Sequence, residues 1–181
     1  GTDGKIAAIK YARINKIPFL GICYGMQMAI IEFARNKLNL KNATSSEFDK
    51  KGLALIGLMN EWNKDGKKIK GTDKSLGGTM RLGSYDAKLM KNSMIQKIYR
   101  KNLIKERHRH RYEVNIDFKE KFEKNGMNFS GLSPDGKLPE IIELKNHPWF
   151  IGVQFHPEFK SRPVAPHPLF SSFIKESKNH K

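Results

Sequence analysis

Apolar and polar residues recur with helical spacing in two early stretches of the chain. Residues 5–15 and 26–38 repeat apolar side chains at intervals of three and four positions, which predicts two amphipathic helices. Pro18 ends the first helix, and the short apolar run at 19–22 has the length and composition of a strand. A helix, a strand and a second helix in succession indicate an α/β fold with a parallel sheet.

The rest of the chain shows the same kinds of pattern. They predict strands at 53–59, 84–90, 127–132, 138–144 and 149–155, and helices at 93–99, 116–125 and 169–178. Polar residues predict a loop at 42–49 and a turn at 63–70. The last strands follow one another through short turns, so part of the sheet is expected to be antiparallel.

Composition limits the classes of protein that fit. The 181 residues are 38% hydrophobic and 29% charged, which suits one globular domain, and no apolar run approaches the roughly 20 residues that span a membrane. The formal net charge of +16 has two interpretations, a nucleic-acid-binding module or a lysine-rich surface in contact with water. Because the basic residues are scattered and mixed with acids, we favour the solvated surface.

The pentapeptide Gly-Ile-Cys-Tyr-Gly at 21–25 joins the predicted strand to the second helix. This is the layout of a nucleophile elbow, with Cys23 as the nucleophile and glycines where a Cβ would crowd the turn. The helix dipole is expected to favour the thiolate there. The alternative is a small buried residue in a glycine-flanked turn. Cys23 is the chain's one cysteine, so no internal disulfide can form, and a reducing compartment is expected.

A histidine and a carboxylate follow the last predicted strand. His156 and Glu158 are two residues apart, so in extended chain their side chains share one side, and Pro157 restricts the backbone between them. Glu158 can hold one tautomer of His156, which activates a nucleophile. With Cys23 they form a Cys/His/Glu triad suited to acyl transfer, and the backbone N–H of Tyr24 supplies one oxyanion donor.

Arginine and histidine alternate in the sequence Glu-Arg-His-Arg-His-Arg-Tyr-Glu. In a strand, Arg107, Arg109 and Arg111 share one face, and His108 and His110 share the other. Three interpretations remain open. The histidines could bind a metal, although no further ligand is nearby, or the arginines could bind phosphates. We prefer the third, in which one arginine clamps a carboxylate while its neighbours form structural ion pairs.

Several motifs together resemble a known family, the class I (triad) glutamine amidotransferases. The Gly-x-Cys-x-Gly elbow followed by Met-Gln, and Gln-Phe-His-Pro-Glu near the end, are typical of the whole family. Other runs are similar to the glutaminase domain of the CTP synthases, namely 31–36, 46–48, the glycine-rich 76–83, 106–115 and 146–150. The resemblance implies a three-layer, flavodoxin-like α/β fold. Its central sheet is mostly parallel, with some antiparallel strands, and is flanked by helices.

The resemblance also implies the roles of the triad. Cys23 is the nucleophile that forms a glutamyl thioester, His156 is the general base and acid, and Glu158 orients His156. The reaction is the hydrolysis of L-glutamine to glutamate and ammonia. Another class I glutaminase, such as that of GMP synthase, is the alternative within the family, and the run at 76–83 argues against it.

Four further residues match positions that contact glutamine in the family. Tyr24 supplies its backbone N–H to the oxyanion, although the family usually has Leu there, and Gln27 binds the substrate. Glu47 suits the α-ammonium group, and Arg111 suits the α-carboxylate because its guanidinium fork matches that shape. No metal is expected in this half of the reaction.

The resemblance implies a larger enzyme. Residues 1–181 are expected to be a glutaminase domain without its N-terminal part, because family members carry a Gly-Gly-Phe-Gly loop, with the second oxyanion donor, shortly before the position of Gly1. A synthetase domain upstream would bind ATP, magnesium and UTP, and would aminate UTP to CTP. GTP would activate hydrolysis. The full enzyme is expected to be a cytoplasmic homotetramer that binds neither nucleic acid nor membrane, and its glutaminase domain is expected to need no cofactor.

Overall fold

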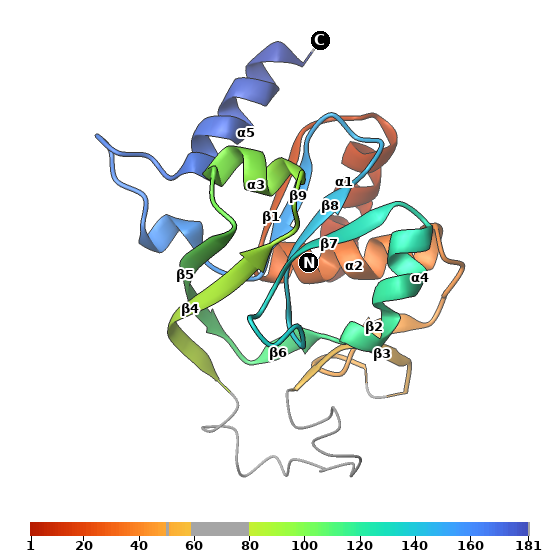
Figure 1. Cartoon of the computed structure of the whole chain (residues 1–181). Helices are drawn as coiled ribbons and strands as arrows, with labels where there is room; N and C mark the ends of the chain where they lie inside the picture. Colours follow the sequence, from red (N-terminus) through yellow and green to blue (C-terminus); the bar gives the residue numbers. More distant parts are fainter. Residues whose placement is uncertain (50, 59–79, 181) are drawn as a thin grey trace.

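The computed structural model describes residues 1–49, 51–58 and 80–180 (Figure 1). The elements are α1 (Thr2–Ile14), β1 (Phe19–Ile22), α2 (Tyr24–Asn36), β2 (Ala43–Ser45), β3 (Leu53–Leu58), β4 (Arg81–Leu89), α3 (Met94–Tyr99), β5 (Leu103–His110), β6 (Tyr112–Val114), η3 (Ile116–Phe118), α4 (Lys119–Lys124), β7 (Met127–Leu132), β8 (Pro139–Leu144), β9 (Phe150–Val153), η4 (Pro157–Phe159) and α5 (Pro168–Asn179).

Most of the predicted elements are confirmed, and β1 and β7 have the predicted bounds. The loop predicted at 42–49 is wrong in part, because it contains β2. This short strand is buried and pairs in parallel with β3, so tertiary contacts override its polar composition. The turn predicted at 63–70 and most of the glycine-rich run at 76–83 lie outside the described residues.

The main sheet has the strand order β1-β9-β8-β7-β4-β5, and a smaller sheet has the order β2-β3-β6. The α/β class and the presence of both strand directions are as predicted. A mostly parallel sheet is not what the described strands form, because in the main sheet β1 and β9 pair in parallel and all other pairings are antiparallel. Parallel neighbours need a long crossover, whereas the short turns that join β7, β8 and β9 reverse the chain.

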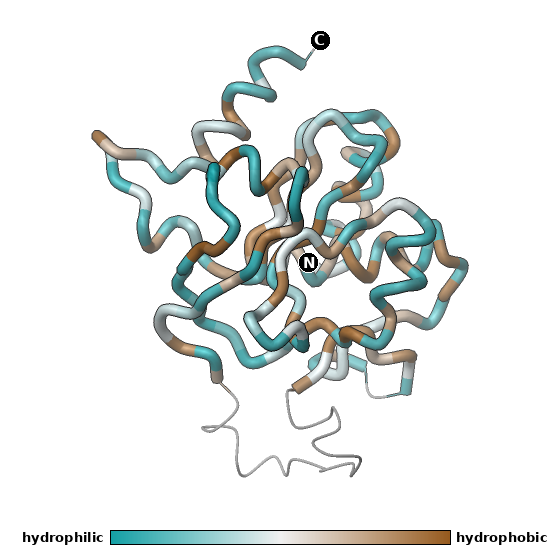
Figure 2. The backbone as a smooth tube through the Cα atoms, in the orientation of Figure 1, coloured by the Kyte–Doolittle hydropathy of each residue, from teal (hydrophilic) through white to brown (hydrophobic). Residues whose placement is uncertain are grey.

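Helices cover both faces of the main sheet and give the predicted three layers (Figure 1). Helices α1, α2 and α4 pack on the face that includes Phe150, and α3 and α5 pack on the face that includes Ile151. These consecutive residues of β9 point to opposite faces, as the strand period requires. Figure 2 shows hydrophilic residues dominating α5 and the outer loops. Among the helices of the described segments, none is long and apolar enough to cross a membrane.

Helix α2 is buried far more completely than an amphipathic pattern predicts. Residues 26–34 are all buried, because the sheet covers one side of the helix and α1 covers another. This burial includes the carboxylate of Glu32, which receives two hydrogen bonds from Arg13 of α1, from Nε at 2.8 Å and from Nη2 at 2.7 Å. The helix that begins at the elbow is thus fixed by apolar packing and by one bidentate ion pair.

Candidate active site

Cys23 lies in the turn between β1 and α2, as predicted. Its φ of 50° and ψ of −102° lie outside the regions that residues with a Cβ favour, which is the strained backbone of a nucleophile elbow. Two backbone hydrogen bonds hold this conformation. The N–H of Cys23 donates to the carbonyl of Val153 at 2.7 Å, and the N–H of Gln27 donates to the carbonyl of Cys23 at 3.2 Å.

The two glycines that flank the elbow differ in their surroundings. A Cβ on Gly21 would lie 2.8 Å from the carbonyl carbon of Gly25, whereas a Cβ on Gly25 would meet nothing within 4 Å. The expectation of crowding is therefore confirmed at Gly21 and wrong at Gly25, where the Cβ direction is open.

These surroundings predict unequal effects of alanine on stability. Gly21→Ala is expected to lower the free energy of unfolding by about 1–3 kcal/mol, because backbone atoms must shift. Gly25→Ala, in the first turn of α2, is expected to change the free energy by less than about 1 kcal/mol, and in the stabilising direction. Urea denaturation of the two variants measures both values, and equal losses would contradict the geometry.

His156 and Glu158 leave the main sheet beside Cys23. Strands β1 and β9 are parallel neighbours with Ile22 opposite Val153, so the residues that follow each strand emerge at one edge of the sheet. The Nδ1 atom of His156 is hydrogen-bonded to Oε1 of Glu158 at 2.6 Å. Because a carboxylate only accepts, this contact places the proton of neutral His156 on Nδ1 and leaves Nε2 as a base.

Two further contacts fix His156, one through its backbone and one through its ring. Its N–H donates to the carbonyl of Arg107 on β5 at 2.8 Å, and the ring of Phe159 stacks on the imidazole with centroids 5.0 Å apart. The Nε2 atom is buried and makes no hydrogen bond with any of the residues that the structure describes. A base held on one side and unpartnered on the other is ready to take a proton from a nucleophile.

The ionisation of the Cys23 thiol differs from the sequence-based expectation. Burial raises the pKa of Cys23 to about 11, and the negative charges of Glu113 and Glu158 raise the pKa further. Hydrogen bonds from the backbone of Tyr24 and the side chain of Gln154 lower it without reversing the effect. The prediction that the helix dipole favours the thiolate is wrong here, since desolvation dominates. The resting thiol is protonated at neutral pH and needs a base to react.

Tyr24 combines a backbone donor with a structural side chain. Its backbone N–H, the expected oxyanion donor of the elbow, is hydrogen-bonded to the Cys23 thiol. Its hydroxyl is hydrogen-bonded to Oγ1 of Thr2 at 2.8 Å, so the ring ties the start of α1 to the start of α2. The aromatic side chain therefore leaves the backbone donor in place.

Two glutamine side chains connect the elbow to Tyr112 of β6. The amide of Gln154 donates to Sγ of Cys23 at 3.6 Å, and Gln27 donates from Nε2 to Oε1 of Gln154 at 3.2 Å and to the carbonyl of Tyr112 at 3.0 Å. No role of its own was predicted for Gln154. A polar residue at the end of an apolar strand, two positions before His156, is the signal that could have singled it out.

Glu47 and Arg111 are the remaining predicted substrate residues. Glu47 is exposed in the turn after β2, where its N–H donates to Oγ of Ser45 at 3.2 Å. Arg111 is half-buried between β5 and β6, directly before the carbonyl of Tyr112 that Gln27 contacts. Arg111 therefore directly precedes a residue that contacts Gln27 of the elbow helix, whereas within the described residues no hydrogen bond or ion pair joins Glu47 to Cys23.

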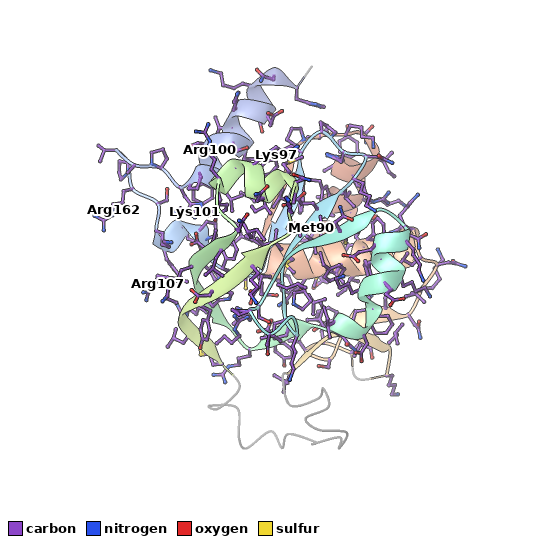
Figure 3. All side chains as sticks on the ribbon, viewed as in Figure 1. Met90, Lys97, Arg100, Lys101, Arg107 and Arg162 are labelled. Atoms are coloured by element: carbon purple, nitrogen blue, oxygen red, sulfur yellow. The ribbon has the colours of Figure 1, made fainter. Side chains whose placement is uncertain are left out.

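The alternation of arginine and histidine is confirmed as a strand pattern. On β5 the side chains of Arg107 and Arg109 are exposed and those of His108 and His110 are buried. Neither exposed arginine forms an ion pair with a residue in the described ranges, and the ion pairs lie on the histidine side instead. Figure 3 shows Arg107 projecting outwards with the exposed basic residues Lys97, Arg100, Lys101 and Arg162.

Comparison with known proteins agrees with this arrangement. Residues 1–176 match the family model described as glutamine amidotransferase class-I. The CTP synthase of Pelagibacter ubique is 87% identical over 181 residues, which are 100% of this chain and 34% of that protein. The CTP synthase of Zymomonas mobilis is 60% identical over 175 residues, which are 96% of this chain and 32% of that protein. The chain thus spans about a third of the length of these relatives.

A solved structure is similar over the whole chain. The structure of the Trypanosoma brucei CTPS glutaminase domain with bound acivicin superposes with a TM-score of 0.86 at 37% sequence identity, covering 100% of this chain and 67% of that one. The family model, the two relatives and this structure all match the chain from the elbow to the His-x-Glu segment. This chain belongs to the class I glutamine amidotransferases.

Proposed function

We propose that the chain hydrolyses L-glutamine to glutamate and ammonia through a thioester on Cys23. One observation carries the proposal. A cysteine with strained backbone and an imidazole fixed by a carboxylate emerge from the ends of adjacent parallel strands, β1 and β9. The likeness to a glutaminase domain solved with acivicin supports the same assignment.

The proposed reaction uses His156 as both base and acid. Its Nε2 takes the thiol proton as Sγ of Cys23 adds to the carboxamide carbon, and the charge that develops on the carboxamide oxygen lies by the N–H of Tyr24. His156 then gives the proton to the leaving nitrogen, the C–N bond breaks, and ammonia departs. Water that loses a proton to His156 cleaves the thioester, and the thiol recovers that proton. Glu158 holds Nδ1–H and stabilises the imidazolium in both steps.

We assign the substrate's polar ends to the outer residues. Arg111 would clamp the α-carboxylate through its guanidinium fork, and the exposed carboxylate of Glu47 would pair with the α-ammonium group. Gln27 uses Nε2 for Tyr112 and Gln154, so its Oε1 is the atom that would accept a hydrogen bond from the substrate. No metal is needed for any of these steps.

The names of the relatives support a proposal for the activity of the whole protein. We assign the ammonia to the ATP-dependent amination of UTP to CTP, as the names of the CTP synthase relatives indicate. In this proposal residues 1–181 are the glutaminase domain, and a synthetase domain outside them binds ATP, Mg²⁺ and UTP. GTP would act as the activator, and the assembly would be a cytoplasmic homotetramer.

A diazo-ketone analogue of glutamine tests the proposed function directly. We expect mass spectrometry to show one adduct on Cys23, because the triad activates this thiol towards a glutamine-shaped electrophile. Excess L-glutamine should prevent the adduct, and Cys23→Ala should carry none. Excess D-glutamine, the enantiomer of L-glutamine, serves as the matched competitor and should protect far less, since it misplaces the α-groups.

The outcomes separate a glutamine site from a merely reactive thiol. An adduct that forms equally with or without L-glutamine would contradict the proposal. So would the absence of any adduct on the folded chain and on the longer protein that contains it.

A further inference from the structure

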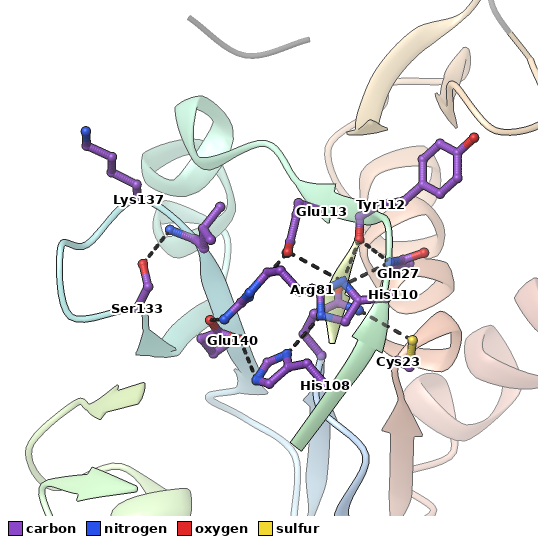
Figure 4. A network of polar contacts seen from close by, with 12 residues as sticks. Cys23, Gln27, Arg81, His108, His110, Tyr112, Glu113, Ser133, Lys137 and Glu140 are labelled. Carbon is purple, nitrogen blue, oxygen red and sulfur yellow. Dashed lines mark hydrogen bonds and ion pairs between the residues drawn. The ribbon is translucent and has the colours of Figure 1, made fainter. Parts of the chain in front are cut away.

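Five buried side chains form a closed polar ring behind the elbow (Figure 4). Arg81 donates from Nη1 to Oε1 of Glu113 at 3.3 Å and from Nη2 to Oε1 of Glu140 at 2.8 Å. Glu113 contacts Nδ1 of His110 at 3.4 Å, and Glu140 contacts Nε2 of His108 at 3.7 Å. Nδ1 of His108 and Nε2 of His110 close the ring at 2.9 Å. The members come from β4, β5, β6 and β8, and all of them are buried.

The ring is connected to the nucleophile by a continuous chain of hydrogen bonds. Nδ1 of His110 lies 3.2 Å from the carbonyl of Tyr112, which also receives the amide of Gln27. Gln27 donates to Gln154, and Gln154 donates to Sγ of Cys23. Figure 4 shows this path from the ring to the sulfur. Any shift of the ring that moves the Tyr112 carbonyl is therefore transmitted to the donor on the thiol.

The hydrogen-bond directions and the charges in the ring favour one extra proton, shared by its two carboxyl groups. The Tyr112 carbonyl only accepts, so Nδ1 of His110 carries its proton, and Nε2 of His110 accepts from Nδ1 of His108. Nε2 of His108 then presents a lone pair to Oε2 of Glu140. Oε2 of Glu140 and Oε2 of Glu113 are both buried without a hydrogen-bond partner among the described residues, so the proton can rest on either carboxyl group. The two carboxyl groups also share a single cation, Arg81, so one proton makes the ring neutral.

The electrostatics agree with a shared proton. Burial raises the pKa of Glu113 to about 8, against the opposing effect of Arg81, and burial also raises the pKa of Glu140. Burial lowers the pKa of His108 to about 2 and that of His110 to about 3, so both imidazoles are neutral. At neutral pH the ring thus holds one guanidinium, one carboxylate and one carboxylic acid, with no net charge. The other charges that act on it are those of His156 and Asp135.

We propose that Arg81 and Glu113 are positioning residues of the glutaminase site, which set the ionisation of the Cys23 thiol through this buried ring. The proposal rests on the function proposed above and adds the buried ring to the residues of that site. Glu113 is the ring member whose charge acts on Cys23, and Glu158 is the other carboxylate that does so. While Glu113 holds the shared proton, the thiol sees one negative charge fewer, and the transfer of its proton to His156 is easier.

The test is the rate at which iodoacetamide alkylates Cys23 as a function of pH. The rate follows the thiolate fraction, and the chain has one cysteine, so the signal comes from one site. In the wild-type chain the thiol titrates after Glu113 has lost its proton. Glu113→Gln is therefore expected to raise the rate at pH 9 about threefold or more, because a negative charge is removed from beside the thiol.

A second variant should act in the opposite direction. In Glu140→Gln, Glu113 no longer shares the guanidinium of Arg81 with a second carboxyl group, so Glu113 ionises at neutral pH. We therefore expect alkylation at pH 7 to slow about twofold or more. Near pH 10 this variant should match the wild-type chain, because Glu113 is ionised in both. Glu143→Gln is the matched control, since Glu143 is a buried carboxylate on the same strand that caps the N–H groups of Met94 and Ile95 instead. It should leave alkylation unchanged.

The outcomes decide the proposal whether or not a variant folds. A folded Glu113→Gln chain with wild-type alkylation at every pH would overturn it. The wild-type chain gives an independent reading, because the logarithm of its rate should rise with a slope below one between pH 7.5 and 8.5, where Glu113 loses its proton, and a uniform slope of one would count against the ring. Failure of diazo-ketone labelling would contradict the glutaminase assignment without affecting the iodoacetamide titration. A failure of the proposed function can therefore be told apart from a failure of the proposal about the ring.

Discussion

Replacing His156 with Asn is expected to slow the modification of Cys23 by the diazo-ketone analogue about a thousandfold at pH 7.5. The thiol has a pKa of about 11 in the folded chain, so only about one molecule in three thousand carries the thiolate at that pH without help from a base. In the wild-type chain, Nε2 of His156 takes the proton as the sulfur reacts, which typically accelerates such a step about 10²- to 10⁴-fold. Asn keeps a hydrogen bond to Glu158 and removes the base.

The pH dependence separates loss of a base from loss of structure. In the His156→Asn variant the rate should rise about tenfold for each unit of pH up to about pH 10, because hydroxide then supplies the thiolate that His156 no longer generates. The wild-type rate should change far less over this range. His180→Asn, at the exposed end of α5, is the matched control and should leave the rate unchanged. A variant that stays slow at pH 10 while remaining folded would argue against general-base catalysis.

Three local features of the sequence have the predicted geometry in the structure. The elbow needs a glycine before the nucleophile because Gly21 packs against the backbone of Gly25, and that requirement is visible in the pentapeptide itself. The separation of His156 and Glu158 by one proline likewise fixes their mutual geometry within three residues. The alternation on β5 predicted which side chains are buried, since a strand's period is two residues.

The parts that depend on long-range contacts could not be predicted in this way. The pKa of Cys23 depends on burial and on Glu113, which lies ninety positions away in the sequence, on β6, and pairs there with β3. The ring around Arg81 draws on four strands, so no segment of the sequence displays it. The mixed sheet has the same cause, because strand direction depends on the connections rather than on the composition of each strand.

The stability of the elbow helix is expected to depend strongly on Arg13. Replacing Arg13 with Met would leave the carboxylate of Glu32 fully buried without its partner, and we expect the free energy of unfolding to fall by about 3–5 kcal/mol. Glu32→Met should cost less, about 1–2 kcal/mol, because Arg13 retains 12% exposure and its guanidinium can turn towards water. Urea denaturation, analysed with one common m-value, measures both free energies of unfolding.

The double variant tests whether the cost lies in the unpaired charge. Arg13→Met combined with Glu32→Met replaces the ion pair by two apolar side chains of similar length, and its stability should lie above that of Arg13→Met alone. Lys10→Met, at an exposed position of α1, removes a positive charge that forms no ion pair within the described residues, and it should stay within about 0.5 kcal/mol of the wild-type chain. If Arg13→Met cost no more than Lys10→Met, the bidentate contact between α1 and α2 would not be what fixes the helix behind Cys23, and apolar packing alone would have to hold the nucleophile's strained backbone.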